Sequence, residues 1–169
     1  MDYDSAFNQL IGNEGRYTAD PRDRGNWTSG ICGQGECKGT KFGISAMAYP
    51  SIDIANLTLA QAREIYRRDY WDKMGCEALP DLARFQCFDA AVNSGVSTAA
   101  RMLQRAVGAP DDGAIGPVTL HQASLLQPAQ IVARFNGERL VYLLGMDTNR
   151  WAAFGRGWVK RVAENLKLA

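Results

Sequence analysis

The chain has 169 residues, a length that fits one globular domain or one domain with a closely packed subdomain. Hydrophobic residues make up 46% of it, yet no run approaches the roughly 18 consecutive apolar residues that a membrane span needs. Nineteen Lys and Arg stand against 18 Asp and Glu, so the net charge of +1 gives no overall field for nucleic acid. We therefore expect no nucleic-acid partner and no stable membrane insertion.

The first predicted element is a short amphipathic helix. Its apolar stripe has helical spacing and consists of Tyr3, Phe7, Leu10 and Ile11. Glu14 continues the stripe at the helix end, where Gly15 is the expected stop. The stretch 16–41 is rich in Gly, Asp, Thr and Pro and is long for a compact domain, which is typical of functional or disordered loops. Trp27 and Ile44 argue against simple disorder because they need burial. A resemblance to lysozyme-like folds would imply a small β-hairpin region here as the alternative to an irregular loop.

Helical patterns dominate the rest of the chain. Thr58 and Gln61 form a capping-box pattern, and Pro117 suits the first turn of a later helix. Ser97 is expected to cap a helix that ends at Gly108. The positions expected to face the core include Leu59, Ala62, Ile65, Leu82, Phe85, Phe88, Ala100, Leu103, Val107, Ile131, Val132, Phe135, Leu143, Val162 and Leu166. The pattern predicts a mainly α domain with a helical bundle core and a long loop near the N-terminus.

The four cysteines leave several pairings open. Cys32 and Cys37 lie in the glycine-rich loop, where a disulfide, half of a metal site or free thiols are all compatible with the spacing. Cys76 and Cys87 do not form a second closely spaced pair, and the single histidine, His121, is distant in sequence. We therefore expect no metal and no cofactor. A cytoplasmic origin favours free thiols.

Glu14 is the candidate for acid chemistry. Cleavage of a glycosidic bond needs a carboxylic acid that stays protonated near neutral pH, and apolar surroundings raise the pKa of a glutamate. The alternative is a solvated glutamate at a helix end. Asp23 follows nine residues later and Thr28 five after that, which resembles the Glu–Asp–Thr arrangement of phage-type lysozymes. That resemblance implies that Asp23 and a threonine activate the attacking water, and Thr40 competes with Thr28 for this role.

A longer run carries a more specific resemblance. Residues 13–25 read N-E-G-R-Y-T-A-D-P-R-D-R-G and 40–44 read T-K-F-G-I. They resemble the signature of glycoside hydrolase family 108, E-G-G-Y followed by D-P-x-D-x-G-G and T-[KN]-Y-G-I, and residues 66–71 match a further family segment. In that family the signature glutamate is the essential catalytic residue, which corresponds to Glu14. Arg16 and Asn26 replace signature glycines, so we expect an altered loop geometry.

The second half adds to the resemblance. Residues 88–95, 103–106 and 111–119 resemble the predicted peptidoglycan-binding segment that accompanies this family. The last run also has a purely structural explanation, an Asp-Gly turn before a Gly-Pro helix start. The resemblance implies a lysozyme-like α+β fold in one globular unit, with a muramidase catalytic part in residues 1–87 and a helical peptidoglycan-binding-like part in 88–169.

Further residues are candidates for substrate binding. Asp89 and Asn93 lie four apart on one helix face, where they either line a sugar cleft or hydrogen-bond to the long loop. Tyr17 and Trp27 flank the acid and are candidates to stack on sugar rings, although such aromatics also build cores. The remaining candidates are Asp20 and Thr28.

The resemblance implies a monomeric N-acetylmuramidase that cleaves peptidoglycan glycan strands between N-acetylmuramic acid and N-acetylglucosamine. One alternative is a lytic transglycosylase, which uses the muramic 6-hydroxyl in place of water. Another is a non-catalytic wall-binding or secretion-associated protein, which the joint presence of Glu14, Asp20 and Asp23 disfavours. From Arg150 onward five cations face one acid, Glu164, which favours either contact with a polyanion such as the cell wall or a solvated helix face.

The N-terminal residues M-D-Y-D-S lack the pattern of a secretory signal. We therefore expect a phage endolysin that is made in the host cytoplasm and reaches the wall in the periplasm through a separate pore. A secreted bacterial muramidase is the alternative.

Overall fold

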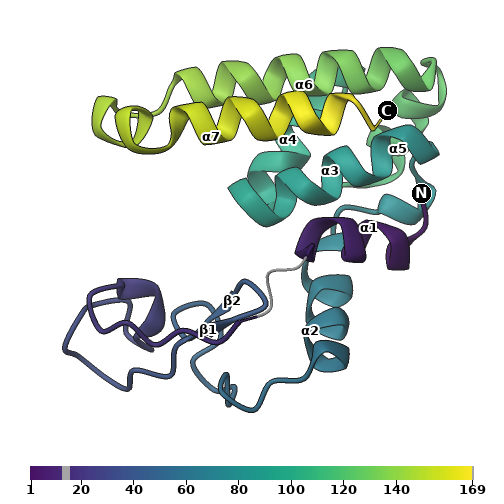
Figure 1. Ribbon diagram of the computed structural model, residues 1–169. Helices are drawn as coiled ribbons and strands as arrows, with labels where there is room; N and C mark the ends of the chain where they lie inside the picture. The colour runs from purple at the N-terminus through teal and green to yellow at the C-terminus, as the bar shows by residue number, and fades with distance from the viewer. Residues whose placement is uncertain (13–15, 169) are drawn as a thin grey trace. The chain divides into compact units, whose positions relative to one another are not determined.

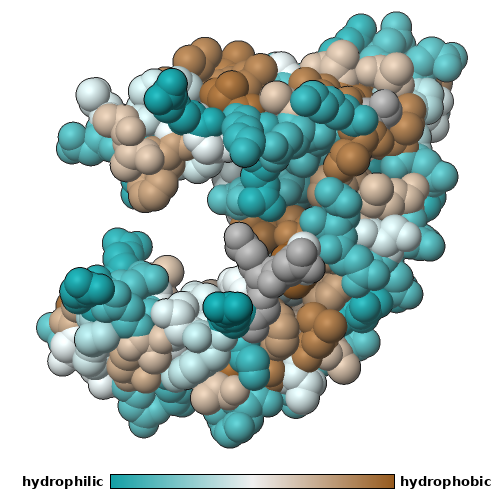
Figure 2. All heavy atoms as spheres, viewed as in Figure 1, coloured by the Kyte–Doolittle hydropathy of each residue, from teal (hydrophilic) through white to brown (hydrophobic). Residues whose placement is uncertain are grey.

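A computed structural model describes residues 1–12 and 16–168 of the chain (Figure 1 as a ribbon, Figure 2 as spheres coloured by hydropathy). The described α-helices are α1 (Tyr3–Ile11), α2 (Leu59–Tyr66), α3 (Asp81–Ser94), α4 (Val96–Val107), α5 (Pro117–Ser124), α6 (Pro128–Leu144) and α7 (Thr148–Leu166). Single-turn helices are η1 (Arg24–Asn26), η2 (Arg67–Trp71) and η3 (Cys76–Ala78), and β1 (Thr40–Lys41) pairs with β2 (Ile44–Ser45). The predicted mainly α fold is confirmed. In the described ranges, no helix has the length and apolarity to cross a membrane.

The chain divides into two compact units. The loop unit consists of residues 7–67, and the helical unit consists of residues 1–6 and 68–169. This division follows packing alone. The expected division of function after residue 87 stays a prediction.

The helical unit is built on contacts of α3 and α4 with α6, and α7 packs on α6. Its core contains an aromatic cluster in which the ring centroids of Tyr3 and Trp71 lie 5.3 Å apart and those of Trp71 and Phe88 lie 5.5 Å apart, all at edge-to-face angles. Phe135 of α6 is fully buried as well. Such geometry adds about 0.5–1.5 kcal/mol per pair beyond the burial of area.

Local capping signals set most helix ends. At α2 the Thr58 hydroxyl accepts a hydrogen bond from the Gln61 amide, and the Gln61 side chain accepts one from the Thr58 amide, as the capping box predicts. Pro117 begins α5, and Gly108 ends α4 in the left-handed conformation, both as expected. Ser97 as a cap is wrong, because α4 already begins at Val96.

Two other groups of expectations are wrong. Helix α1 ends at Ile11, and Gly12 takes a left-handed φ of 53°, so the helix stops before the expected Gly15, which lies outside the described residues. Three of the predicted core leucines are exposed, because helical periodicity shows a stripe and not its extent. They are Leu59 (45%), Leu82 (41%) and Leu166 (41%).

The loop unit is anchored by α2. Its Tyr66 ring packs edge-on against Phe7, and the Tyr66 hydroxyl donates a hydrogen bond of 3.0 Å to the Phe42 carbonyl. Phe42 and Gly43 form the two-residue turn between β1 and β2, and both have positive φ, as a tight hairpin turn with right-handed strand twist requires. A Cβ on Gly43 would lie 2.5 Å from the Tyr66 hydroxyl, so this position needs glycine. The expected small β-hairpin region is present.

All four cysteines are free thiols. Cys32 is exposed and Cys37 half-buried in the loop unit, whereas Cys76 and Cys87 are buried in the helical unit. Burial raises the pKa of Cys76 well above its usual range and that of Cys87 to about 12, so neither is a thiolate at neutral pH. Across residues 1–12 and 16–168, no cluster of three His, Cys, Asp or Glu side chains has the arrangement of a metal site.

Candidate active site in the loop unit

The stretch 16–41 folds back on itself as a ladder of backbone hydrogen bonds. Thr18 and Thr40 exchange both of their N–H···O bonds, at 2.9 and 2.8 Å. Trp27 pairs with Cys37, and the Thr28 amide donates to the Glu36 carbonyl at 3.0 Å. The long loop is therefore an ordered scaffold (Figure 1), which supports the functional reading of its length.

Asn26 is the central polar link of this scaffold. Its side chain is fully buried, and its amide nitrogen donates to the Asp20 carbonyl at 3.0 Å. Its amide oxygen accepts a hydrogen bond of 2.8 Å from the Thr40 hydroxyl. The Asn26 carbonyl also accepts from the Gly39 amide. From the sequence, Asn26 is seen only as a replacement of a signature glycine. The neighbouring residues do not show that its hydrogen-bond partners lie 6 and 14 residues away.

The two loop carboxylates have different surroundings. Asp20 forms a two-pronged pair with Arg22, with N···O distances of 3.0 and 2.7 Å, and this hydrogen bonding lowers the pKa of Asp20. One Asp23 oxygen accepts the Gly25 amide at 2.9 Å and caps η1. Within the described part of the chain no cation pairs with Asp23. Its carboxylate therefore keeps acceptor capacity for a water or a sugar hydroxyl.

The two candidate threonines also differ. The Thr28 hydroxyl accepts the Glu36 amide at 3.1 Å and so helps to close the loop tip. The Thr40 hydroxyl donates its hydrogen to the Asn26 amide oxygen. The lone pairs of the Thr40 oxygen therefore remain as acceptors with a fixed orientation. Thr40 is thus held as a hydrogen-bond acceptor for a water, whereas Thr28 is engaged in the scaffold.

The two candidate stacking residues lie on the same ladder. Tyr17 is 44% exposed and packs over Gly39, where an added Cβ would lie 2.6 Å from the Tyr17 ring. The Trp27 indole is half-buried and donates to the Pro21 carbonyl at 2.9 Å. Tyr17 is therefore exposed to a larger fraction than Trp27 is.

Asp89 and Asn93 belong to the helical unit. The Asp89 carboxylate is 1% exposed and accepts hydrogen bonds from Arg139 (2.7 Å), Arg161 (2.7 Å) and Asn165 (2.6 Å). These partners come from α6 and α7, and neither alternative drawn from the sequence included them. Asn93 is exposed and donates to the Asp89 carbonyl at 2.6 Å.

Comparison with known proteins decides the family. A family model described as Glycosyl hydrolase 108 matches residues 7–95, more than half of the chain. The chain belongs to glycosyl hydrolase family 108. Among solved structures it is similar to Brucella abortus SagA, with a TM-score of 0.80 and 29% identity over 98% of this chain and 91% of that chain. No curated protein matches it.

The family resemblance seen in the sequence is therefore confirmed, and this family 108 protein is a glycoside hydrolase that acts on peptidoglycan. The matched range contains the whole ladder and the candidates Asp20, Asp23 and Thr40. Glu14 also falls in this range, but it lies outside the described residues. In this family 108 hydrolase the Asn26 side chain, at a position where the signature seen in the sequence has glycine, is hydrogen-bonded on both sides.

Proposed function

We propose that this hydrolase is an N-acetylmuramidase that cleaves the bond between N-acetylmuramic acid and N-acetylglucosamine, with Glu14 as general acid. Asp23 and Thr40 would hold the attacking water. The observation that carries the proposal is the Thr40 hydroxyl oxygen, which Asn26 holds in a fixed orientation as an acceptor. The same loop contains the Asp23 carboxylate, which has no cation partner among the described residues. An unpaired carboxylate and a fixed hydroxyl oxygen are what a water nucleophile needs to be aligned and deprotonated.

Chain connectivity supports Thr40 over Thr28. Thr18 lies four residues after Glu14, and four residues span at most about 14 Å. Thr18 is also the backbone partner of Thr40. Thr40 therefore pairs with a segment that is close in sequence to Glu14, whereas the Thr28 hydroxyl accepts the Glu36 amide at the loop tip.

The same pair favours hydrolysis over the transglycosylase reaction. A transglycosylase uses an internal hydroxyl of the substrate as nucleophile, so it has no need of groups that hold a water. Purified peptidoglycan digested in isotopically labelled water should give reducing N-acetylmuramic acid ends that carry the label, as read by mass spectrometry. Unlabelled 1,6-anhydro ends would assign the transglycosylase reaction instead.

Replacing Asp23 by Asn should lower the hydrolysis rate by about 10²-fold or more, because the carboxylate charge that activates water or stabilises the developing cation is lost. The amide oxygen can still accept the Gly25 amide, so the cap on η1 should survive. The measurement is the initial rate of turbidity loss of purified wall.

Asp20→Asn is the matched control for that experiment, because it changes a loop carboxylate that Arg22 already occupies. We expect less than about threefold loss for the control. A loss of that small size for Asp23→Asn would transfer the role to Asp20, Glu36 or a threonine, and Thr40→Val and Thr28→Val can be compared in the same assay.

We further propose that the enzyme is a monomeric phage endolysin, made in the host cytoplasm and admitted to the periplasm by a separate pore. A peptidoglycan hydrolase is the activity that host lysis requires. Its gene should then lie beside phage genes that include one for a membrane pore. A gene neighbourhood of bacterial secretion components would favour the secreted muramidase.

A further inference from the structure

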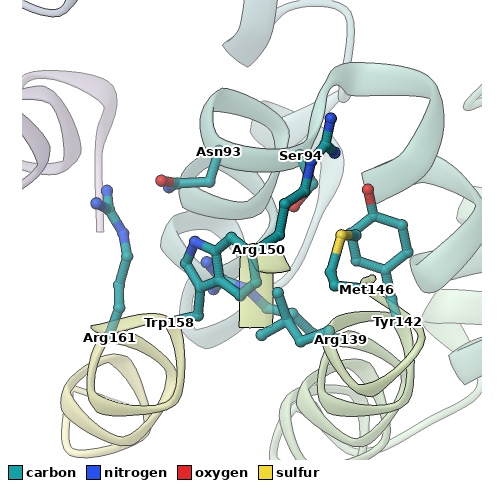
Figure 3. A pocket seen from close by; sticks show the side chains of 9 residues that line it. Asn93, Ser94, Arg139, Tyr142, Met146, Arg150, Trp158 and Arg161 are labelled. Atoms are coloured by element: carbon teal, nitrogen blue, oxygen red, sulfur yellow. The ribbon is translucent and has the colours of Figure 1, made fainter. Parts of the chain in front are cut away.

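The helical unit contains a pocket of about 130 Å³ that the loop unit does not contribute to. Figure 3 shows its side chains coming from the end of α3, from α6, from the turn after α6 and from α7. The residues that matter for binding are Asn93, Arg139, Tyr142, Arg150, Trp158 and Arg161. The pocket therefore combines guanidinium and amide groups with two aromatic rings.

Positive charge exceeds negative charge at this pocket. Three guanidinium groups line it, those of Arg139, Arg150 and Arg161. Asp89 is shared by Arg139 and Arg161, and Asp147 lies 3.4 Å from the Arg150 Nε. The Arg150 pair is mostly exposed and hence weak. Among the described residues, the three arginines of the lining thus share two carboxylates, and the excess positive charge favours an anionic ligand.

One arginine that lines the pocket has a donor atom without a partner among the described residues. The Arg139 side chain is 3% exposed, and its Nη1 is buried without a hydrogen bond to any residue that the structure describes. Buried polar groups of this kind are rare because they lose their hydration and gain nothing in return. The other Nη atom of Arg139 is bound to Asp89, so the guanidinium orientation is fixed. Nη1 is covered in this conformation, so a ligand oxygen would reach it only after a shift of the side chains around it.

The two aromatic rings of the pocket favour a ligand that is larger than an inorganic ion. Trp158 and Tyr142 offer apolar ring surface next to the guanidinium groups. Peptidoglycan carries an anionic group on a body that is larger than an inorganic ion. Its muramic acid bears a lactyl group. The carboxyl of this lactyl group is either free or extended by a stem peptide that itself ends in a carboxylate. A guanidinium group is well suited to bind a carboxylate, because it can donate two parallel hydrogen bonds to the two carboxylate oxygens.

We propose that this pocket binds a carboxylate of peptidoglycan, from the lactyl group or from the stem peptide, through residues other than those proposed to cleave it. This inference rests on the proposed function for its choice of ligand. It gives the expected wall contact of the basic C-terminal segment a defined site, built on Arg150 and Arg161.

The test is a binding titration of the full-length enzyme with three ligands, followed by the NMR signal of the Trp158 indole N–H. The ligands are N-acetylglucosaminyl-N-acetylmuramic acid with a tetrapeptide, the same disaccharide without peptide, and chitobiose. None contains the bond that the enzyme is proposed to cleave. Four tryptophans give four indole signals, and Trp158→Phe identifies the relevant one.

We expect the Trp158 signal to shift with at least one muramic ligand and not with chitobiose, which has no carboxylate. Arg150→Gln should raise the Kd of that ligand about tenfold, and Arg156→Gln, an exposed arginine of α7 outside this pocket, should not change it. Binding of the peptide-free disaccharide assigns the lactyl carboxylate. Binding of the tetrapeptide ligand alone assigns the stem peptide.

Equal shifts with chitobiose, or an unchanged Kd in Arg150→Gln with intact circular dichroism, would overturn the carboxylate site. No shift with any ligand would also overturn it and would leave a buried water between Arg139 and Asn136, whose Oδ1 is likewise unpartnered among the described residues, as the explanation. The labelled-water digestion is independent of this titration, so a failure of either result identifies which of the two proposals is wrong.

Discussion

Replacing Glu14 by glutamine should remove almost all lytic activity and leave the fold intact. The amide is nearly isosteric with the carboxylic acid, so packing is preserved, while the proton that must reach the leaving oxygen is lost. General acid catalysis contributes about 10²–10⁴-fold to such reactions, and the loss should be of that order. The measurement is the clearing of permeabilised Gram-negative cells together with circular dichroism.

Glu36→Gln is the matched control for this experiment. Glu36 is a second glutamate of the same unit, it is largely exposed, and its carboxylate pairs with Lys38 at 3.1 Å. We expect this variant to keep nearly full activity. Substantial lysis by a folded Glu14→Gln protein would show that another group donates the proton. Failure of the wild-type protein to clear cells or to digest wall would favour the non-catalytic wall-binding alternative.

Replacing Asp89 by alanine should lower the free energy of unfolding by about 3–5 kcal/mol, because removing one partner of a buried ion pair leaves the other charge uncompensated. Asp89 accepts hydrogen bonds from Arg139, Arg161 and Asn165. Its loss would leave the buried Arg139 guanidinium without its carboxylate and would remove the polar contacts that this residue makes between α3 and α7. Urea denaturation followed by circular dichroism measures the change.

The control for Asp89 is Asp111→Ala, which removes an acid that pairs with Arg105 at 2.8 Å in the same unit. Both side chains of that pair are about half exposed, so we expect a change below about 1 kcal/mol. An Asp89→Ala protein that is less than about 1 kcal/mol destabilised would mean that the carboxylate cluster contributes no more than a surface pair.

Sequence reasoning succeeded where the determinant is local. The Thr58 capping box, the Pro117 helix start and the Gly108 helix end depend on residues a few positions apart, and all three are present. It also assigned the family, because the signature around Glu14 and Thr40 is a pattern in the sequence itself.

It failed where partners are distant in the chain. The three side chains that hold Asp89 lie 50, 72 and 76 residues away, so no spacing rule connects them to it. Asn26 is the same case within the loop, since its side chain joins backbone and hydroxyl groups on two different segments. Helical periodicity could not show that Leu82 faces outward, because burial depends on which neighbours cover each face.

The ladder of the loop unit has a consequence for how this enzyme can diverge. Its outermost backbone pair is Thr28–Glu36, and residues 29–35 form a tip beyond it, across which the Ser29 hydroxyl donates to the Gln34 carbonyl at 2.8 Å. The entropic cost of closing a loop grows only slowly with its length, so insertions and deletions in the tip should be tolerated. The closure at Thr28 and Glu36 isolates Asn26 and Thr40 from such changes. Variation in tip length would thus change the surface that the tip presents to the cell wall, without moving the residues proposed to hold the water.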